Sequence, residues 1–432
     1  MENDTIKLLL LEGIDVDIDK SHVNNINNVF ECFVALKDHH PCCEICGSLN
    51  VISHGYSLKK ITHSISTNQP CILKYKARRY LCKDCGKTFF EKNPFCQEND
   101  KISLFTEIKA LEKLRSHTST FATVARDLNT TSQSIMNIFD KYVYAPRLPL
   151  SEVICIDEIY TNRLTTRKYS CVIANFFTNK LMDVLPSRHK LDLLNYFGKI
   201  PIDECKRVRF VICDMWETYR DVAYTTFPNV KVAVDSFHVI QHLNNAIDSI
   251  RLKVMRKYYK AHNKLEQADM YYYMLKRFHY FFSRNFDSIY DGLIEVRKLR
   301  TKWDKYTIRS YLLSIDDDLK YAFLLKERYQ EFNYYANYED CDDELDDFID
   351  RFQSSHLEEL RAFGCLLKRW RAEIKNSFIR INKRRLSNGA MEGINSQLKC
   401  IIKNANGYRN FERFRRRCMF AINKDTPIIN PK

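Results

Sequence analysis

The pattern of apolar and polar positions divides the chain into stretches of different character. From residue 150 onward, short apolar runs follow one another: "VICID", "YSCVIANFF", "LMDVLP", "VRFVICD" and "VKVAV". Runs of this length favour buried strands, and the helical stretches between some of them indicate one mixed sheet. Residues 237–380 then have almost uniformly helical character, with very little Gly or Pro. The pattern therefore predicts an α/β core followed by a long helical segment.

The flanking regions have patterns of their own. Residues 1–35 are predicted to form a short helical lead-in, and the alternation in "CILKYKARRY" predicts short strands within residues 36–98. Residues 100–143 have helical spacing with a break at "LNTTS". The acidic run at 339–350 is typical of a solvated helix start or loop. The last part of the chain is strongly basic.

Two CxxC pairs stand in the strand-rich region, Cys43 with Cys46 and Cys82 with Cys85. Four thiolates in two such pairs fit a tetrahedral zinc site, and a metal would stabilise a region that is small for a core of its own. Gly86 follows the second pair and can adopt the positive φ of a tight turn. One alternative is four ordinary buried thiols. The other is a ligand set that includes a neighbouring residue: Cys42, Cys71, Cys96, His39 or His40.

The formal net charge of +14 over 432 residues favours an anionic partner such as nucleic acid. Arg78 and Arg79 stand beside Lys74, Lys76 and two tyrosines, a composition that suits phosphate contacts. No apolar run reaches the roughly 18–20 residues that span a bilayer, and the first residues do not match a signal peptide. We therefore expect a cytoplasmic protein without a membrane partner, in agreement with sixteen cysteines scattered along the chain.

The stretch "STFATVARDLNTTSQSIMNIFDKY" has the parts of a helix-turn-helix. Apolar residues from Phe121 to Leu128 form one helical face, "NT" breaks that helix, and the Thr or Ser that follows can cap the next one. The outward residues of the second helix would be Gln133, Ser134 and Asn137. A purely structural helical hairpin has the same pattern, so both interpretations stay open.

Three acidic residues are candidates for chemistry. Asp157 and Asp214 each end an apolar strand, and Glu392 lies near the start of a helix in "NGAMEGINSQLKCIIK". Carboxylates at strand ends can converge on one rim of a sheet and bind Mg²⁺. Two ions so held would activate a water or a DNA 3′-hydroxyl and stabilise the leaving oxygen at phosphorus. Taken singly, each acid is more often a cap or a surface charge.

Glu392 is surrounded by basic residues, and aromatic side chains interleave with them. Lysines and arginines there can neutralise phosphates beside the acids. The candidates for such contacts are Lys399, Lys403, Arg409 and Arg413.

The chain resembles the ISL-three family of bacterial insertion-sequence transposases. The matching segments run in family order and cover nearly the whole chain: "CCEICGS", "RRYLCKDCGKTF", "IDEIY", "ICDMWETYRDVA", "VDSFHVIQHLNNAID" and "NGAMEGINSQLKCIIKNANGYRNFERFRRR". The last of these is the most specific.

The resemblance implies an RNase H-like α/β core with a mixed five-stranded sheet. It also implies a DDE triad, which falls on Asp157, Asp214 and Glu392 and would hold two Mg²⁺ or Mn²⁺ ions. The partners would be the terminal inverted repeats and the target DNA, bound by a homodimer near the bacterial nucleoid. In such a core, strands are expected near 153–157, 169–176, 181–186, 208–213 and 230–234, and helices near 188–198 and 216–226, with a further helix from about 237.

Six segments follow from pattern and resemblance together: a lead-in helix at 1–35, a zinc ribbon that binds DNA at 36–98, a helix-turn-helix that binds DNA at 99–148, the first part of the core at 149–244, an all-helical insertion at 245–375, and the Glu helix with the basic C-terminus at 376–432.

Two kinds of alternative remain. Asp235 and His238 also sit at a strand end, so Asp235 could replace Asp214 as a metal ligand and His238 could contact the scissile phosphate. At the level of function, the alternatives are a zinc-ribbon DNA-binding regulator without catalysis and an RNase H-like nuclease such as a junction resolvase.

Overall fold

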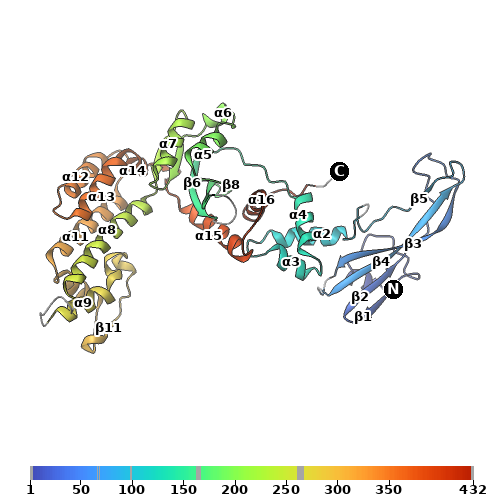
Figure 1. Ribbon diagram of the computed structural model, residues 1–432, viewed down its shortest axis with the longest axis horizontal. Helices are drawn as coiled ribbons and strands as arrows, with labels where there is room; N and C mark the ends of the chain where they lie inside the picture. The colour runs from blue at the N-terminus through green and yellow to red at the C-terminus, as the bar shows by residue number, and fades with distance from the viewer. Residues whose placement is uncertain are drawn as a thin grey trace. The chain divides into compact units, whose positions relative to one another are not determined.

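The computed structural model describes residues 3–65, 67, 69–97, 100–161, 167–259 and 267–429. The chain divides into two compact units, which are described separately (Figure 1). Unit 1 comprises Met1–Leu148, Ile159–Tyr169 and Ile394–Lys432, and unit 2 comprises Pro149–Glu158 and Ser170–Gly393. None of the described helices combines the length and the apolar character that crossing a bilayer would require.

Unit 1 begins with a five-stranded sheet in which four strands follow the order β1-β2-β4-β3 and β5 pairs with β4. The strands are β1 (His22–Ile26), β2 (Val29–Val34), β3 (Val51–Ser64), β4 (Pro70–Cys82) and β5 (Thr88–Phe90). The alternation in β4 buries Leu73, Tyr75 and Ala77 completely on one face. This face packs against a small apolar core formed with residues from the N-terminal segment.

The helical lead-in predicted at 1–35 is wrong for most of its length. Only α1 (Asn3–Leu8) is helical there, and β1 and β2 form a hairpin that joins the sheet through parallel pairing of β2 with β4. Asn27 and Asn28 have φ angles of 52° and 66°, the left-handed conformation of a two-residue hairpin turn that asparagine tolerates. The strand-rich module therefore starts before residue 36.

The helices α2 (Leu104–Leu114), α3 (Phe121–Asp127) and α4 (Ser132–Tyr142) follow the sheet in unit 1. Thr120 caps α3 and Thr131 caps α4, each by accepting a hydrogen bond from a backbone N–H of the first turn. Asn129, at φ 52°, reverses the chain between the two helices. Of the apolar positions expected to face inward, Phe121 is only partly buried. The others are buried: Val124, Ala125, Leu128, Ile135, Ile138 and Phe139.

The last helix of the chain, α16 (Phe411–Ile422), completes this helical core instead of joining the sheet of unit 2. Phe420 is fully buried, with its ring 5.8 Å from that of Phe139. Arg417, also fully buried, donates hydrogen bonds to the carbonyls of Ser116 and Ser119 at 2.7 and 2.8 Å. We expected residues 376–432 to belong as a whole to the catalytic core, and for α16 the structure shows a different neighbour.

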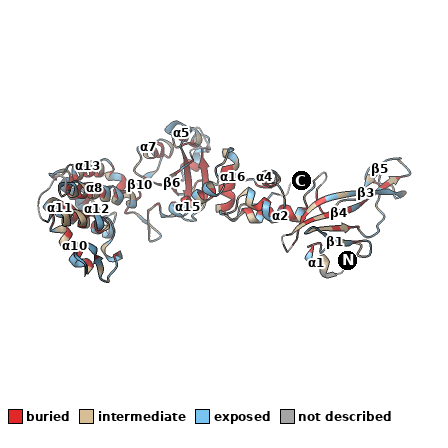
Figure 2. Cartoon of the chain, turned by 60° about the horizontal axis from the view of Figure 1, so that its bottom comes forward, coloured by how far each residue is buried: buried red, intermediate tan, exposed pale blue. Residues whose placement is uncertain are grey.

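Unit 2 contains a mixed five-stranded sheet in the order β10-β9-β6-β7-β8. The strands are β6 (Val153–Tyr160), β7 (Tyr169–Asn175), β8 (Leu181–Leu185), β9 (Phe210–Cys213) and β10 (Lys231–Val234), close to the expected ranges. β6, β9 and β10 run parallel, whereas β7 and β8 are antiparallel. Most strand residues are buried on both faces, as Figure 2 shows. The helices of this region are α5 (Lys190–Phe197), α6 (Ile202–Cys205) and α7 (Glu217–Thr226).

A long insertion follows β10 and has its own aromatic-rich core. It is mostly helical, but the antiparallel strand pair of Ile294–Val296 and Thr301–Trp303 contradicts the expectation of an all-helical segment. It contains α8 (Ser236–Lys257), α9 (Ala268–Arg277), η1 (His279–Phe282), η2 (Phe286–Ser288), β11 (Ile294–Val296), η3 (Arg297–Leu299), β12 (Thr301–Trp303), α10 (Lys305–Leu313), α11 (Asp317–Tyr335), α12 (Cys341–Gln353), α13 (Glu358–Arg369) and α14 (Arg371–Asn376). The acidic run lies on α12, as a solvated helix. A hairpin of β13 (Arg380–Ile381) and β14 (Arg384–Arg385) then leads into α15 (Gly389–Asn404).

Candidate active site and metal-binding clusters

Two neighbouring parallel strands bring acidic residues together. The pairing of β6 with β9 ends at Cys155 and Ile212, so Asp214 follows directly after β9 and Asp157 lies just past the paired part of β6. β6 itself runs on to Tyr160, so Asp157 is inside the strand and not at its end as the sequence pattern predicted. Because the two strands are parallel, both carboxylates lie at the same edge of the sheet.

The structure adds a third carboxylate to this edge. Ligand atoms of Asp157, Glu158 and Asp214 all lie within 4.8 Å of one another. The Oδ1 atom of Asp214 is buried and has no hydrogen-bond partner among the described residues, which is costly for a carboxylate oxygen unless a cation or a donor occupies the space in front of it. Oxygen ligands at this spacing suit a hard divalent cation.

The electrostatics of the cluster favour the same conclusion. Burial, together with the negative charge of Asp157, raises the pKa of Asp214 to about 6. Burial, and next the charge of Asp214, raises the pKa of Glu158 to about 7. Like charges held close together in a half-buried site disfavour ionisation, and a bound cation would remove that penalty.

Glu158 is held by two side chains from other elements of unit 2. Its Oε1 accepts a hydrogen bond from Arg188 Nη1 at 2.5 Å, and its Oε2 accepts one from the Tyr219 hydroxyl at 3.4 Å. The guanidinium of Arg188 also stacks over the Trp216 ring, 4.2 Å from its centre. The Tyr219 ring contacts Trp216 edge-on, with the ring centres 4.8 Å apart. The positively charged guanidinium of Arg188 is thus held beside the three carboxylates.

Among the described residues, Glu392 lies outside this group of carboxylates. It lies in the first turn of α15 and is exposed. Asn388, which precedes α15 and is buried, donates a hydrogen bond from Nδ2 to the Ile156 carbonyl at 3.4 Å. This bond fixes the start of the Glu392 helix next to the strand that carries Asp157.

Asp235 and His238, the rival candidates, are placed differently. Asp235 follows β10, is 95% buried, and caps α8 by accepting a hydrogen bond from the Phe237 N–H at 3.2 Å. Among the described residues it does not belong to the carboxylate group. His238 is half-buried in the first turn of α8, with its ring 5.7 Å from that of Phe237. The cap explains Asp235 without a metal.

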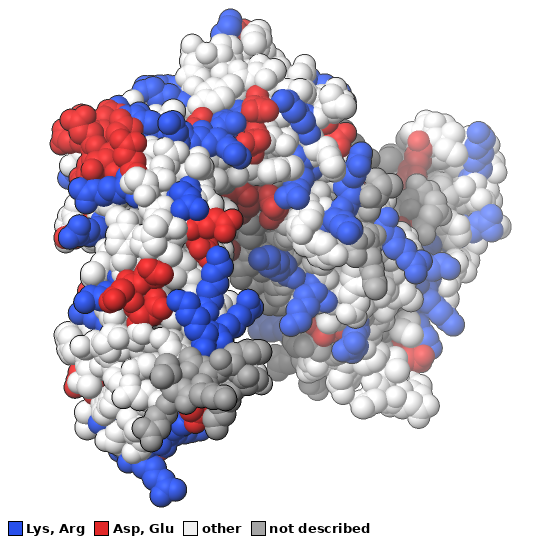
Figure 3. Space-filling view, turned by 60° about the vertical axis from the view of Figure 1, so that its left-hand side comes forward, with Lys and Arg blue, Asp and Glu red and all other residues white. Residues whose placement is uncertain are grey.

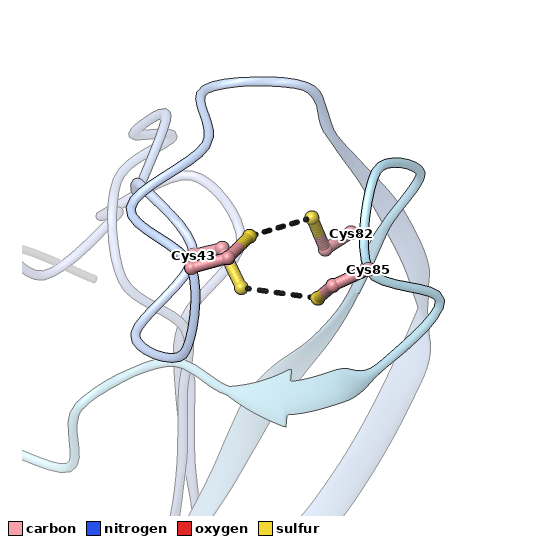
Figure 4. Close-up of side chains that lie close together, drawn as sticks. Cys43, Cys82 and Cys85 are labelled. Atoms are coloured by element: carbon pink, nitrogen blue, oxygen red, sulfur yellow. Dashed lines mark hydrogen bonds between the residues drawn. The ribbon is translucent and has the colours of Figure 1, made fainter.

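A second cluster, in unit 1, consists of the four predicted cysteines Cys43, Cys46, Cys82 and Cys85. The Sγ atoms of Cys43 and Cys85 are 3.8 Å apart and those of Cys46 and Cys82 are 3.6 Å apart (Figure 4). Tetrahedral zinc with Zn–S bonds of about 2.3 Å requires sulfur atoms about 3.8 Å apart. The spacing therefore fits a four-thiolate zinc site.

Both halves of the cysteine cluster have the same turn. The Gly47 N–H donates to the Cys43 carbonyl at 2.8 Å, and the Gly86 N–H donates to the Cys82 carbonyl at 2.9 Å. Both glycines have left-handed φ angles, 72° and 70°. Two of the other possible ligands have different neighbours: Cys71 Sγ is 3.5 Å from Cys32 Sγ, and Cys96 Sγ donates to the Asp100 carbonyl.

The comparisons with known proteins show the family of the chain. Residues 154–418, more than half of the chain, match a family of ISL-three-type DDE proteins that is described as transposase. The chain belongs to this transposase family. It is also 20% identical over 378 residues to the transposase for insertion sequence element IS1001 of Bordetella parapertussis, a match that covers 86% of each chain. The resemblance found in the sequence is thereby confirmed.

Two arginines of the transposase that were predicted to contact DNA have partners within the protein. Arg78 is 93% buried; its guanidinium donates to the Leu36 carbonyl and pairs with Asp38 at 3.0 Å. Arg413 on α16 pairs with Asp140 on α4, with Nη2 and Oδ2 2.5 Å apart. Both side chains link separate segments of unit 1. A guanidinium that is buried wholly or in part is stabilised by such an acceptor. We do not retain them as DNA contacts.

The other predicted contacts are on the surface. Arg79, Gln133 and Asn137 are exposed, and Ser134 is partly exposed. Gln133 Nε2 donates to Asn137 Oδ1 at 2.8 Å, so the two side chains lie on one face of α4. Exposed positions at the C-terminal end are Lys399, Lys403 and Arg409.

Sequence reasoning missed three residues of the acidic site. Glu158 is adjacent to Asp157, but strand alternation argues against both carboxylates facing one site. Arg188 stands in "PSRHK", a turn with no motif of its own. Asn388 carries no pattern that would predict its burial or its hydrogen bond to β6, because that partner is more than 200 residues away in the sequence.

Proposed function

We propose that this transposase cleaves DNA at the ends of an insertion sequence and joins them to a target by metal-dependent phosphoryl transfer. The single observation that carries the proposal is the convergence of Asp157 and Asp214, with Glu158, within 4.8 Å at the edge of the sheet of unit 2. The mixed five-stranded sheet is, on this proposal, an RNase H-like core.

Asp157, Asp214 and Glu392 are the proposed ligands of two Mg²⁺ or Mn²⁺ ions. Two such ions, when bound, supply Lewis acidity for the attacking and leaving oxygens of an in-line displacement. The buried Oδ1 of Asp214 has no hydrogen-bond partner in the part of the chain that the structure describes, which supports the role of Asp214 as a ligand. Glu392 would complete the set from the first turn of α15, where the helix dipole also favours a carboxylate.

The chain's own side chains would prepare the site for a phosphate. Glu158 and Trp216 already hold the Arg188 guanidinium beside the carboxylates. Arg188 would therefore lose little conformational freedom when a phosphate binds. Asn388 holds the start of α15 against β6. Asp235 would stabilise the start of α8 and hold no metal.

Recognition of the terminal inverted repeats is assigned to unit 1. α3 and α4 form the proposed helix-turn-helix, with Gln133, Ser134 and Asn137 on the recognition helix facing base edges. The four-cysteine module is the proposed zinc ribbon, in which zinc would be structural and Arg79 would contact phosphate. Lys399, Lys403 and Arg409 would contact the phosphate backbone of the DNA. Joining two ends in one reaction predicts a homodimer on DNA.

A strand-joining assay with duplexes that carry the element's own ends tests the proposal. Wild-type protein with Mg²⁺ or Mn²⁺ is expected to nick the end and to transfer it to a second duplex. Cleavage without joining would indicate a nuclease of the resolvase class, and specific binding without cleavage would indicate a regulator. Either outcome would overturn the proposal.

A further inference from the structure

The helical insertion of unit 2 carries one β-hairpin, formed by β11 and β12. Val296 pairs with Thr301 in an antiparallel register, and the short helix η3 makes the turn between the strands. Arg300 ends η3 with a φ of 52°, which reverses the chain. Four of the ten residues between Ile294 and Trp303 are basic and one is acidic.

The basic residues of this hairpin face solvent. Arg297, Lys298, Arg300 and Lys302 are all exposed. Arg297 lies 3.5 Å from Glu295, and Lys298 pairs with Asp269 on α9. Lys302 is opposite Glu295 in the strand register, yet in the described part of the chain neither Lys302 nor Arg300 has an acidic side chain within ion-pair distance. The charges of Arg300 in the turn and of Lys302 on β12 are therefore available to an anionic partner.

The hairpin is anchored to the apolar core of the insertion. Val296 is fully buried in the core of the insertion, and Ile294 and Trp303 pack against the same core. The pair of Lys298 with Asp269 joins the turn to α9. The apolar Leu299 stands at the tip among the cations, with 46% of its surface exposed. A rigid two-stranded ribbon with basic residues at its turn has dimensions that a DNA groove admits.

The hairpin lies away from the strand that carries Asp157 and Glu158. Figure 1 shows β11 at the end of the insertion away from the sheet strand β6. Basic side chains project from the corresponding lower end of the molecule in Figure 3, whereas acidic side chains gather in a patch higher on the same face. The acidic patch would repel DNA, and the hairpin would attract it.

We infer that the β11–β12 hairpin is a DNA-contacting element, in which Arg300 and Lys302 neutralise backbone phosphates of duplex DNA outside the catalytic centre. Contacts of this kind carry no base specificity, because phosphates are the same in every sequence. The inference rests on the proposed function only in taking duplex DNA as the substrate.

The test is the salt dependence of binding to a labelled random-sequence duplex of about 40 base pairs, at roughly 0.05 to 0.3 M NaCl. Wild type is compared with Arg300→Gln/Lys302→Gln. The slope of log Kobs against log salt is expected to become less steep by about 1.8, and affinity at about 0.1 M salt to fall by ten- to a hundredfold, because two counterion-releasing contacts are lost. The matched control is Lys320→Gln/Arg328→Gln, which removes two exposed charges from α11 of the same insertion. The control is expected to keep the wild-type slope.

An unchanged slope in a hairpin variant that unfolds at the wild-type temperature would overturn the inference while leaving the proposed function intact. Wild type that fails to bind any duplex would instead contradict the proposed function. A hairpin variant with a normal slope but an altered sedimentation coefficient would identify the hairpin as a contact between copies of the chain and would also overturn the inference.

Discussion

At the scale of single residues, the carboxylates of Asp157, Glu158 and Asp214 repel one another, and the guanidinium of Arg188 offsets only part of that charge. The raised pKa values of Asp214 and Glu158 express this cost. In a site that binds a divalent cation, the bound ion removes this repulsion between carboxylates. Asp235, in contrast, is stabilised by its cap and carries no such conflict.

Asp214→Asn is therefore expected to stabilise the protein when a chelator removes divalent ions. Because the folded-state pKa of Asp214 is about 6, above the ordinary 3.8, the folded state binds the extra proton. Stability is thus lost as pH rises from about 4 to about 6, and the cost is fully present above that range. The gain in unfolding free energy should reach at most about 3 kcal/mol at pH 8 and vanish near pH 4.

Thermal unfolding with chelator and with Mn²⁺ measures both effects. Asp214→Asn should also abolish the stabilisation by Mn²⁺ that wild type shows. Asp235→Asn is the matched control, since asparagine caps a helix about as well as aspartate; it should keep the Mn²⁺ response. The reverse pattern would make Asp235 the ligand.

At the scale of elements, the agreement between sequence and structure depends on how local the signal is. Apolar runs of four to eight residues located all five strands of the unit 2 sheet, because strands buried on both faces carry little else. The cap of α4 could also be predicted, because Thr131 stands directly before the helix that it caps. The β1–β2 hairpin was missed because its turn uses Asn27 and Asn28, a weaker signal than Asn-Gly.

Partners distant in sequence could not be predicted. Arg78 and Arg413 have the composition of a DNA-binding surface, yet their acceptors, Asp38 and Asp140, are brought to them only by the fold. Glu158 was missed because alternation along a strand predicts the wrong face for it. The sequence therefore indicated Asp157 and Asp214, but neither Glu158 nor the arginine and asparagine that fix its surroundings.

The cysteine turns give a prediction for an element. Cys85→Ser should lower bound zinc from about one ion per chain to none, since a structural site with three thiolates binds zinc far more weakly. It should also lower the unfolding temperature of the β1–β5 sheet. Zinc content by mass spectrometry measures the first effect.

Cys42→Ser is the control for this variant, because Cys42 is exposed and adjacent to the cluster but outside it. It should retain zinc. Loss of zinc in both variants, or in neither, would contradict the ligand set of Cys43, Cys46, Cys82 and Cys85.

At the scale of the whole molecule, unit 1 is built from both ends of the chain. α16 lies almost 270 residues after α4 in the sequence, yet its Phe420 fills the core between α2, α3 and α4. The pair of Arg413 with Asp140 and the contacts of Arg417 with the α2–α3 loop reinforce this packing. The proposed recognition helices therefore depend on the C-terminal segment for their stability.

Phe420→Ala is expected to destabilise this helical module by about 3–5 kcal/mol, the usual cost of a cavity of that size. Denaturant unfolding, with protection of the α4 amides from hydrogen exchange, measures the loss. Phe411→Ala on the same helix is the control, because Phe411 is only half-buried, and it should cost much less. Equal effects of the two variants would mean that α16 does not complete the core.

Strand transfer by carboxylate variants tests the central claim most directly. Asp157→Asn, Asp214→Asn and Glu392→Gln should each bind duplexes carrying the element's ends as wild type does, yet lose at least about a thousandfold in Mn²⁺-dependent cleavage and joining, because each removes a metal ligand. Asp235→Asn should keep wild-type activity. Normal strand transfer by any one of the three variants would contradict the triad of Asp157, Asp214 and Glu392.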